Sequence, residues 1–150
     1  MTETVYYNKI KDLIRWVPVN GDIWSPENTD RVNTYGSETI LGWSNSYGKN
    51  NFAVNGTYAY TVSENVDTKK QLFFVPYHKA TASFAYSYSQ FSVNSQYLYN
   101  GFVYTRSDND PNETVEAYQV VNIGADYDFG FLKTSKLGFQ VLNVFNQKYE

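Results

Sequence analysis

The sequence predicts an all-β chain, a segment of an antiparallel, up-and-down transmembrane β-barrel with about seven strands that leaves the barrel incomplete. Three observations lead to this fold class. Apolar and small polar side chains alternate along successive stretches. Between residues 80 and 103 the polar set contains no charged residue. Long, charged connections alternate with short ones, as they do in outer-membrane barrels, whose strands need about ten residues each.

The clearest element is a hairpin within residues 77–104. A two-residue loop at Ser89-Gln90 places Tyr88 opposite Phe91, Tyr86 opposite Val93 and Ala82 opposite Tyr97, so both apolar sets fall on one face. These sets are Ala80, Ala82, Phe84, Tyr86 and Tyr88 before the loop, and Phe91, Val93, Tyr97, Tyr99 and Val103 after it. The opposite face carries uncharged Ser, Thr, Asn and Gln. A soluble sheet would present Lys and Glu there, so the pattern favours a wall between lipid and a hydrated lumen.

The first half of the chain predicts three more strands. Residues 4–17 form the least regular one, because lysines and an arginine interrupt its pattern: Tyr6, Ile10, Ile14 and Trp16 alternate with Lys9, Lys11 and Arg15. Pro18, Gly21 and Ser25-Pro26-Glu27-Asn28 predict a loop over residues 18–29. Alternation resumes over residues 34–43, and residues 44–50 are expected to turn. Residues 52–62 then alternate without charge, with Phe52, Val54, Tyr58, Tyr60 and Val62 on one side.

The second half of the chain shows the same alternation of strands and connections. Residues 63–76 and 106–116 are long, charged connections, and residues 118–129 alternate more loosely. Residues 130–136 are expected to turn the chain into a last strand that runs from Leu137 to Glu150, whose outer side is Leu137, Phe139, Val141 and Phe145. A competing interpretation makes Asn100-Gly101 a type I′ turn and shortens the strands, and Asn55-Gly56 has the same ambiguity.

Composition narrows the classes of protein. Aromatic residues make up 19 % of the chain, with 15 Tyr and 10 Phe, and tyrosine suits a membrane interface because its ring is apolar and its hydroxyl is polar. A stretch of about 18 apolar residues is absent, so a transmembrane helix is not expected. The net charge of −3 without a basic stripe argues against nucleic-acid binding. The chain has no Cys, and its first four residues lack the features of a signal peptide.

Few residues are candidates for chemistry, and none assembles into a catalytic set, so an enzyme is not expected. The single histidine, His78, lies beside Lys79 at the start of a strand and reads as an interfacial residue, because metal sites need several donors. The loop from Asp108 to Glu113 has part of the spacing of a calcium loop. It fails at the sixth position, where Glu113 replaces glycine, and at the twelfth, where Gln119 replaces glutamate.

The remaining candidates are weaker. Glu38 shares the side of Gly36 and Gly42, which is the lumen side on the barrel interpretation, and a solvated or structural charge is the simpler reading. The sequons at Asn55 and Asn112 carry no meaning in a bacterial protein. Tyrosines at strand ends could stack on a ligand, but an interfacial girdle explains them as well. Ligand-binding residues therefore stay unassigned, and no metal or cofactor is expected.

Four runs, over residues 6–14, 34–38, 76–80 and 137–150, resemble the barrel of TonB-dependent outer-membrane receptors, the cobalamin and siderophore receptor family. The most specific covers residues 137–150, because the penultimate strand of the family follows the pattern v-x-N-l-f-N-x-x-Y. Residues 34–38 and 76–80 carry weaker matches, and residues 6–14 also look like a strand of this family. The runs read Leu-Gly-Phe-Gln-Val-Leu-Asn-Val-Phe-Asn-Gln-Lys-Tyr-Glu, Thr-Tyr-Gly-Ser-Glu, Pro-Tyr-His-Lys-Ala and Tyr-Tyr-Asn-Lys-Ile-Lys-Asp-Leu-Ile.

The resemblance implies a location and partners. Family members import scarce ligands such as siderophores, cobalamin or oligosaccharides across the outer membrane of Gram-negative bacteria. Their barrel has about 22 strands around an N-terminal plug, and TonB supplies energy through that plug. On this mapping residues 1–150 are a C-terminal segment of the barrel, without the plug domain and the closing strand. The expected partners are outer-membrane lipid, the rest of the barrel with its plug, and TonB.

Two other readings stay open at the level of sequence. The chain could be a small, self-contained porin-like barrel or adhesin, which needs an even number of strands and a partner for its first strand. It could also be a soluble antiparallel β-protein that binds a sugar or peptide on its aromatic face. Open edges argue against a stable seven-stranded sheet alone in a bilayer, because unpaired backbone groups cost several kcal/mol each in hydrocarbon. Rings buried against a second layer of the chain would contradict the barrel interpretation.

Overall fold

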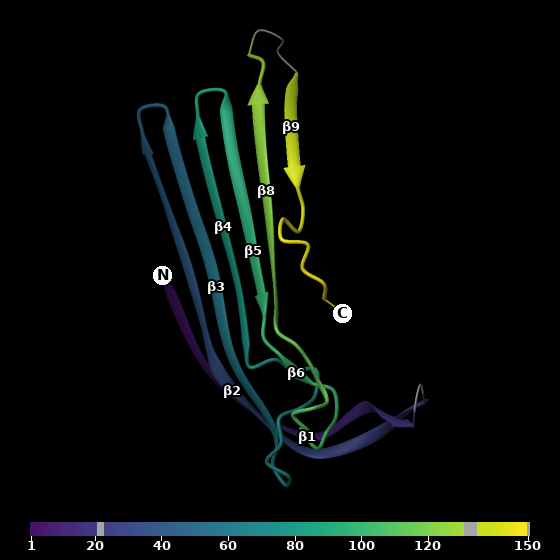
Figure 1. Ribbon diagram of the computed structural model, residues 1–150. Coiled ribbons are helices and arrows are strands. Elements are labelled where there is room, and N and C mark those ends of the chain that lie inside the picture. Colours follow the sequence, from purple (N-terminus) through teal and green to yellow (C-terminus); the bar gives the residue numbers. More distant parts are fainter. Residues whose placement is uncertain (21–22, 131–134, 150) are drawn as a thin grey trace.

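Seven strands form one antiparallel sheet in the order β1-β2-β3-β4-β5-β8-β9 among the residues that the computed structural model describes, which are 1–20, 23–130 and 135–149 (Figure 1). Each strand pairs with the next along the chain, except that a separate β6–β7 ribbon lies between β5 and β8 in sequence. The up-and-down topology is therefore confirmed. The strands are β1 (Thr2–Asn20), β2 (Ile23–Tyr47), β3 (Asn50–Asn65), β4 (His78–Tyr88), β5 (Phe91–Asn100), β6 (Val103–Tyr104), β7 (Thr114–Val115), β8 (Tyr118–Asp128) and β9 (Lys136–Val141).

The sheet is a single layer, and its rings are exposed. Trp43 is 52 % exposed, Tyr88 50 % and Phe139 70 %. The buried hydrophobic residues among the described ones are Val32, Phe73 and Val103, which lie at or beside the long loops. A soluble sandwich would bury its aromatic face against a second sheet, so that reading is wrong for the described chain. Among these residues, no helix has the length and hydropathy that a membrane crossing requires.

The predicted central hairpin is confirmed in its register. Tyr88 pairs with Phe91 and Ala82 with Tyr97 across the Ser89-Gln90 loop. The loop lacks the usual glycine, and Ser89 takes a φ of 55°. On the same side of the sheet, directly paired residues form one row that crosses six strands. This row is Tyr47, Asn50, Tyr88, Phe91, Tyr127 and Leu137.

The expected loop over residues 18–29 is wrong, because most of it belongs to strands. β1 and β2 form a long ribbon in which Trp16 pairs with Pro26 and Val17 with Ser25. Beyond Val32 this ribbon has only two strands, since β3 ends there. Every second N–H of β2 then needs no partner, so a proline can occupy the strand. Gly21, which was part of the predicted loop, lies outside the described residues.

Two further boundaries differ from expectation. The turn expected over residues 44–50 is shorter in the structure and contains only Gly48 and Lys49. The polar residues before it belong to β2, which continues to Tyr47. The last strand, which was expected to run to the end of the chain, ends at Val141, since Asn143 takes a φ of 48° and left-handed backbone cannot continue a strand. Part of the turn expected over residues 130–136 lies outside the described residues. The Asn55-Gly56 turn is wrong, because both residues lie inside β3.

The Asn100-Gly101 turn is also wrong as a hairpin. β5 does end at Asn100, but the Gly101 amide donates to the His78 carbonyl at 2.8 Å. The chain therefore stays beside β4 and runs on into β6. β6 then pairs with β7 beyond the end of the main sheet, with Val103 opposite Val115. This small ribbon was not predicted, because two-residue strands leave no periodic signal.

The first strand presents Tyr6 to the polar side of the sheet. Tyr6 pairs with Gly36, which pairs with Thr61, and the Tyr6 hydroxyl lies 2.7 Å from the Thr61 Oγ1. Its neighbour Tyr7 instead stacks on Tyr35 at 6.2 Å on the apolar side. The set of β1 side chains that starts at Tyr6 therefore lies on the polar side. Periodicity alone could not show this, because Tyr6 and Tyr7 are adjacent tyrosines and either could belong to the apolar side.

Candidate functional site

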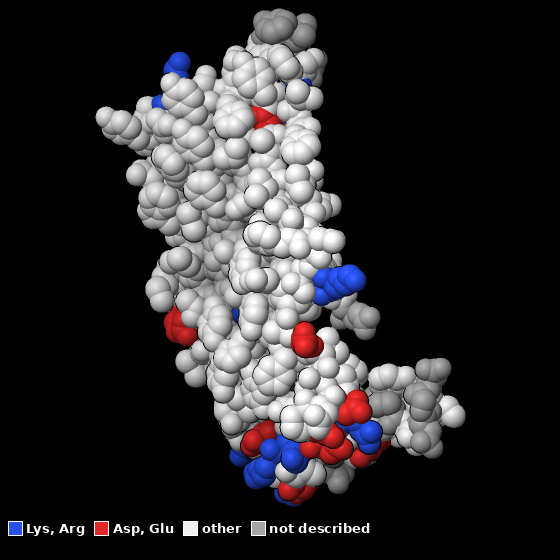
Figure 2. Space-filling view, in the orientation of Figure 1, with Lys and Arg blue, Asp and Glu red and all other residues white. Residues whose placement is uncertain are grey.

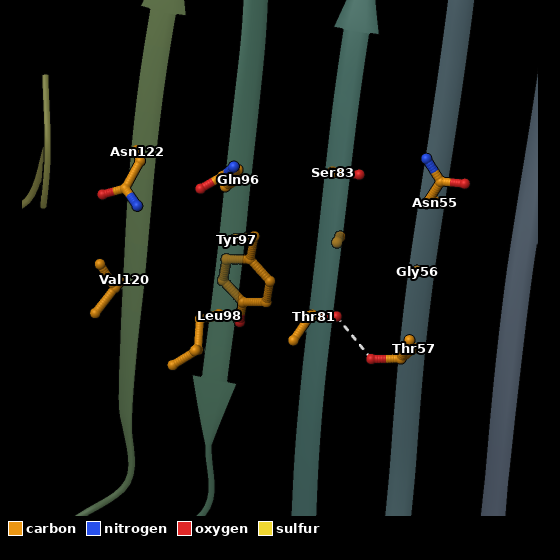
Figure 3. A pocket seen from close by; sticks show the side chains of 11 residues that line it. Asn55, Gly56, Thr57, Thr81, Ser83, Gln96, Tyr97, Leu98, Val120 and Asn122 are labelled. Atoms are coloured by element: carbon orange, nitrogen blue, oxygen red, sulfur yellow. Dashed lines mark hydrogen bonds between the residues drawn. The ribbon is translucent and has the colours of Figure 1, made fainter. Parts of the chain in front are cut away.

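The polar face of the sheet is lined by uncharged amides and hydroxyls in register. Cross-strand pairs place Asn55, Ser83, Gln96 and Asn122 in one row across β3, β4, β5 and β8. Figure 3 shows these four labelled side chains at one level, with the hydrogen bond between Thr57 and Thr81 (2.6 Å) below them. They line a shallow hollow of about 320 Å³. This row can hydrogen-bond water or a polar solute. Nearer the short-turn end the same face carries an ion pair, with Lys136 Nζ 3.7 Å from Asp126 Oδ2.

The apolar face has two aromatic bands. One is the row through Tyr88 and Phe91 at the short-turn end. The other lies toward the long loops and contains Tyr7, Tyr35, Tyr58, Tyr60, His78 and Tyr99. Tyr88 and His78 bound the 11-residue β4, which at ~3.4 Å per residue and a tilt of about 40° separates the bands by roughly 26 Å. An outer-membrane barrel has an apolar band of about 25 Å between aromatic girdles, so the spacing fits a wall that spans hydrocarbon.

Charged side chains gather at the end with the long loops. Figure 2 shows Lys, Arg, Asp and Glu crowded there, whereas the wall above it on this face is almost free of charge. Arg31 pairs with Asp67 at 2.5 Å, and Arg106 approaches Asp108 at 3.9 Å. Charge is costly in hydrocarbon and cheap in water, so the charged end suits an aqueous phase.

The two long loops are fastened to each other by a reciprocal backbone–amide contact. The Gln71 backbone N–H donates to Asn109 Oδ1 at 2.8 Å, and Asn109 Nδ2 donates to the Gln71 carbonyl at 2.9 Å. Gln71 is only 4 % exposed, and its own amide oxygen accepts from the Ser63 N–H at 2.8 Å. The loop over residues 66–77 is thereby joined both to β3 and to the loop over residues 105–113.

Arg15 fastens the β1–β2 ribbon to the same loops. Its Nη2 donates to the Phe73 carbonyl at 2.8 Å, and its guanidinium lies 4.1 Å from the centre of the Phe73 ring. Burial lowers the pKa of Arg15, and the nearby Glu27 carboxylate opposes that shift. Trp24 also stacks on Phe74 at 6.4 Å. The ribbon and both loops therefore form one platform at the charged end, which we call the loop platform.

The loop platform encloses an open hollow of about 310 Å³. Arg15 and Glu27 come from the ribbon, Lys70 from the first loop and Asp108 from the second. Its lining mixes both signs of charge with amide and hydroxyl groups, so it can bind a polar molecule without favouring one sign of charge. This hollow could not be predicted from the sequence, because its lining residues come from four separate segments.

The candidate residues from the sequence do not come together. His78 lies at the loop end of the apolar face, where its Nδ1 is 2.8 Å from the Tyr58 hydroxyl. Glu38 lies on the polar face opposite Ala59. Asp110 Oδ1 accepts from the backbone and side-chain nitrogens of Asn112 at 2.9 Å, so this carboxylate closes a turn. Within the described ranges no three His, Asp or Glu side chains cluster as a metal would require.

Comparisons with known proteins agree with the fold. The family model described as "TonB dependent receptor-like, beta-barrel" matches residues 2–146. No curated protein matches. Among solved structures, the chain named "Copper transporter OprC" is similar, with a TM-score of 0.71 and 19 % sequence identity. The similarity covers 99 % of this chain and 23 % of that chain, so this chain spans about a quarter of the length of the transporter.

The family model and the geometry of the sheet agree that the chain is part of a β-barrel wall. The match covers nearly the whole chain, and the sheet has one polar face, one apolar face with aromatic bands, and long loops at one end only. The chain therefore belongs to the TonB-dependent receptor-like β-barrel family.

Proposed function

We propose that this chain is a C-terminal part of the wall of a TonB-dependent receptor in the outer membrane of a Gram-negative bacterium, and that the whole receptor imports a scarce ligand. In this proposal the apolar face contacts lipid, the polar face lines the lumen, and the loop platform faces the outside. Partners are the remaining barrel, a plug inside it, and TonB acting through the plug. The run over residues 137–149 supports the C-terminal position through its resemblance to the penultimate strand of the family.

One observation carries the proposal: a single-layer sheet whose two faces differ in chemistry over the height of a hydrocarbon core. Val54 and Phe84 are opposite each other on the apolar face, and Asn55 and Ser83 are opposite each other on the polar face. A sheet that separates lipid from water needs this division, because lipid-facing and lumen-facing residues alternate along each strand. Import is the activity that the family membership supports, and the cargo stays open.

The orientation can be tested with nitroxide spin labels. The receptor would be labelled at single cysteines, V54C and F84C on one face and N55C and S83C on the other, and reconstituted in lipid. We expect labels at residues 54 and 84 to collide with dissolved oxygen, and those at 55 and 83 to collide with a water-soluble nickel chelate. Equal accessibility of the two pairs would contradict a wall between lipid and lumen.

Import can be tested separately in cells. A strain that lacks the gene would be given labelled copper, ferric siderophores, cobalamin and oligosaccharides, with and without a protonophore. Copper is included because the similar solved structure is named as a copper transporter. We expect uptake of one cargo to fall in the mutant, to return with a plasmid copy, and to stop when the proton gradient collapses. Uptake of every cargo at the parental rate would contradict the proposed role.

A further inference from the structure

The outer edge of β1 carries one acidic and one basic side chain on the apolar side of the sheet. Glu3 and Lys9 are six residues apart, so alternation along the strand places both on the side of Tyr7. That side is the apolar face, because the Tyr7 ring stacks on Tyr35. In the described part of the chain Glu3 and Lys9 have no ion-pair partner, and both are exposed. These two charges are therefore available to a neighbouring strand.

Glu3 lies level with the aromatic band at the loop end, because cross-strand pairs place it in one row with Thr39, Tyr58 and Tyr99. Its carboxylate accepts a hydrogen bond from the Thr39 hydroxyl. Lys9 lies roughly 16 Å farther toward the long loops, at ~3.4 Å per residue and a tilt of about 40°. Opposite charges on directly paired residues stabilise a sheet, and the gain is larger where the surroundings exclude water.

The nearest carboxylate to Lys9 in its own row belongs to a distant strand. Asn33 pairs with Lys9 across the ribbon, and Glu64 pairs with Asn33. Glu64 is therefore two strands, or roughly 10 Å, from Lys9. The Lys9 ammonium instead lies 5.7 Å from the centre of the Tyr7 ring. A carboxylate on a strand at the free edge of β1 would be only one strand away, at roughly 5 Å.

Lys11, the next basic residue on this side, has charges of both signs around it. It pairs with Arg31, which forms an ion pair with Asp67. Asp12 follows Lys11 with a φ of 56°, and Asp30 precedes Arg31 in the sequence. The charge of Lys11 can therefore be balanced within this chain, so the pattern at the edge consists of the other two residues.

The strand that borders β1 runs in the opposite direction, because up-and-down barrels pair antiparallel strands. β9 does not fit, since the seven strands of the described sheet alternate in direction and β9 runs the same way as β1 (Figure 1). A second receptor inserted in the same orientation would also present its β1 in the parallel direction. A strand of the remaining barrel is therefore the partner that fits this edge.

We propose that the strand of the remaining barrel beside β1 carries a lysine or arginine directly opposite Glu3 and an aspartate or glutamate directly opposite Lys9, both on the lipid-facing side. This inference rests on the proposed function, because it needs β1 to border the rest of a closed barrel. The two ion pairs fix the register of this junction. A slip by one residue moves both partners to the lumen side, and a slip by two moves the basic side chain away from Glu3.

Disulfide cross-linking measures the register in the complete receptor. Val5→Cys is the anchor, because Val5 lies between the two charged residues on the same side and is 79 % exposed. It would be combined with single cysteines along the neighbouring strand, and the position that cross-links fastest lies opposite residue 5. Because the strands are antiparallel, we expect a Lys or Arg two residues after that position and an Asp or Glu four residues before it. An uncharged residue at either place would overturn the proposal, and so would cross-links between two receptor copies, which would identify a second copy as the occupant.

Charge reversal tests the energy of the junction. Glu3→Lys removes an attraction and adds a repulsion, so we expect the equilibrium constant for urea unfolding in lipid vesicles to rise roughly 2- to 30-fold. Thr39→Lys is the matched control, because Thr39 pairs directly with Glu3 and the new lysine lies at the same level beside the carboxylate. This control should be at least as stable as the parent. Changing the opposing basic residue to Glu should restore the Glu3→Lys receptor.

Equal losses of stability in Glu3→Lys and Thr39→Lys would assign the effect to a lysine at this depth and overturn the proposal. Failure of the proposed function is distinguishable, because it would show as equal accessibility of labels at residues 54 and 55. If those labels differ as expected and the cross-linked register shows no complementary charges, the wall is correct and the charged junction is wrong.

Discussion

At the scale of single residues, the contact between Tyr6, Gly36 and Thr61 shows how the sheet is fixed where an aromatic residue faces the polar side. The Tyr6 hydroxyl reaches Thr61, and Gly36 lies between them in the register. A Cβ added to Gly36 would lie 1.9 Å from the Tyr60 carbonyl oxygen and 2.9 Å from the Tyr6 hydroxyl. A tyrosine that covers a glycine across strands restores the packing that glycine lacks.

Gly36→Ala should therefore destabilise the barrel. The backbone of β3 must move to admit the methyl group, which costs about 1 to 3 kcal/mol, as overpacking usually does. Urea unfolding of the receptor in lipid vesicles, followed by tryptophan fluorescence, would measure the loss. Gly42→Ala is the matched control, because its Cβ would meet only Asn55 Oδ1 at 3.4 Å. Equal stability of the two variants would show that β2 and β3 are less closely apposed than described.

The raised pKa of the Tyr77 phenol predicts that the stability of the loop end depends on pH. Burial raises its pKa, and the neighbouring Tyr104 phenol adds to the shift. A group with a raised folded-state pKa contributes stability that is complete below its unfolded value, near 10, and is lost as pH rises through the folded value. The difference in absorbance at 295 nm between the parent and Y77F should therefore titrate at higher pH than free tyrosine. A difference spectrum centred near 10 would contradict this.

At the scale of elements, alternation predicted strands well wherever polar and apolar sets were cleanly separated. The hairpin around Ser89 was right to the residue pair because a two-residue loop fixes register. The β1–β2 ribbon was mispredicted because Pro26 predicts a break in a strand. The structure tolerates this proline because β3 does not extend beside that part of β2, so the missing N–H has no partner to lose. The loop platform could not be predicted at all, since contacts such as Arg15 with Phe73 join residues 58 apart in sequence.

The end of β9 is an element whose geometry depends on one side chain. Asn143 takes a left-handed φ of 48°, its Nδ2 donates to the Gln147 carbonyl, and its Oδ1 accepts from the Gln147 N–H, both at 2.9 Å. This turn directs the Val144 N–H to the Val121 carbonyl at 2.8 Å and allows Tyr149 to stack on Tyr118 at 4.9 Å. The residues after β9 are thus attached to β8 although they have left the sheet.

Asn143→Ala should detach this segment, because alanine loses both side-chain hydrogen bonds and disfavours the left-handed backbone. Asn143→Gly separates the two causes: glycine keeps the conformation and loses only the hydrogen bonds, each worth about 1 kcal/mol. Hydrogen exchange at the Val144 amide should accelerate most in the alanine variant and less in the glycine variant. Similar exchange in both variants would assign the attachment to the hydrogen bonds alone.

At the scale of the whole molecule, the decisive property is that one layer of sheet carries two chemically different surfaces and two free edges. Val5, Trp43 and Phe139 are each more than half exposed, and the outer edges of β1 and β9 have no strand partner among the described residues. Exposed apolar area of this extent marks a surface that another phase or protein covers. Edge strands in hydrocarbon need partners, because each unpaired backbone group costs several kcal/mol.

We therefore expect residues 1–150, expressed alone, to fold only when lipid or detergent covers the apolar face and other strands pair with the two edges. In detergent-free buffer the chain should aggregate, because flat apolar edges pair with other copies. In micelles the face is covered but the edges are not, so a sedimentation experiment should show oligomers rather than a monomer. Adding the remaining barrel as a second chain should restore a discrete complex, since it supplies strand partners for β1 and β9. A soluble monomer that melts cooperatively without detergent would show that the apolar face needs no lipid, and the membrane interpretation would then be wrong.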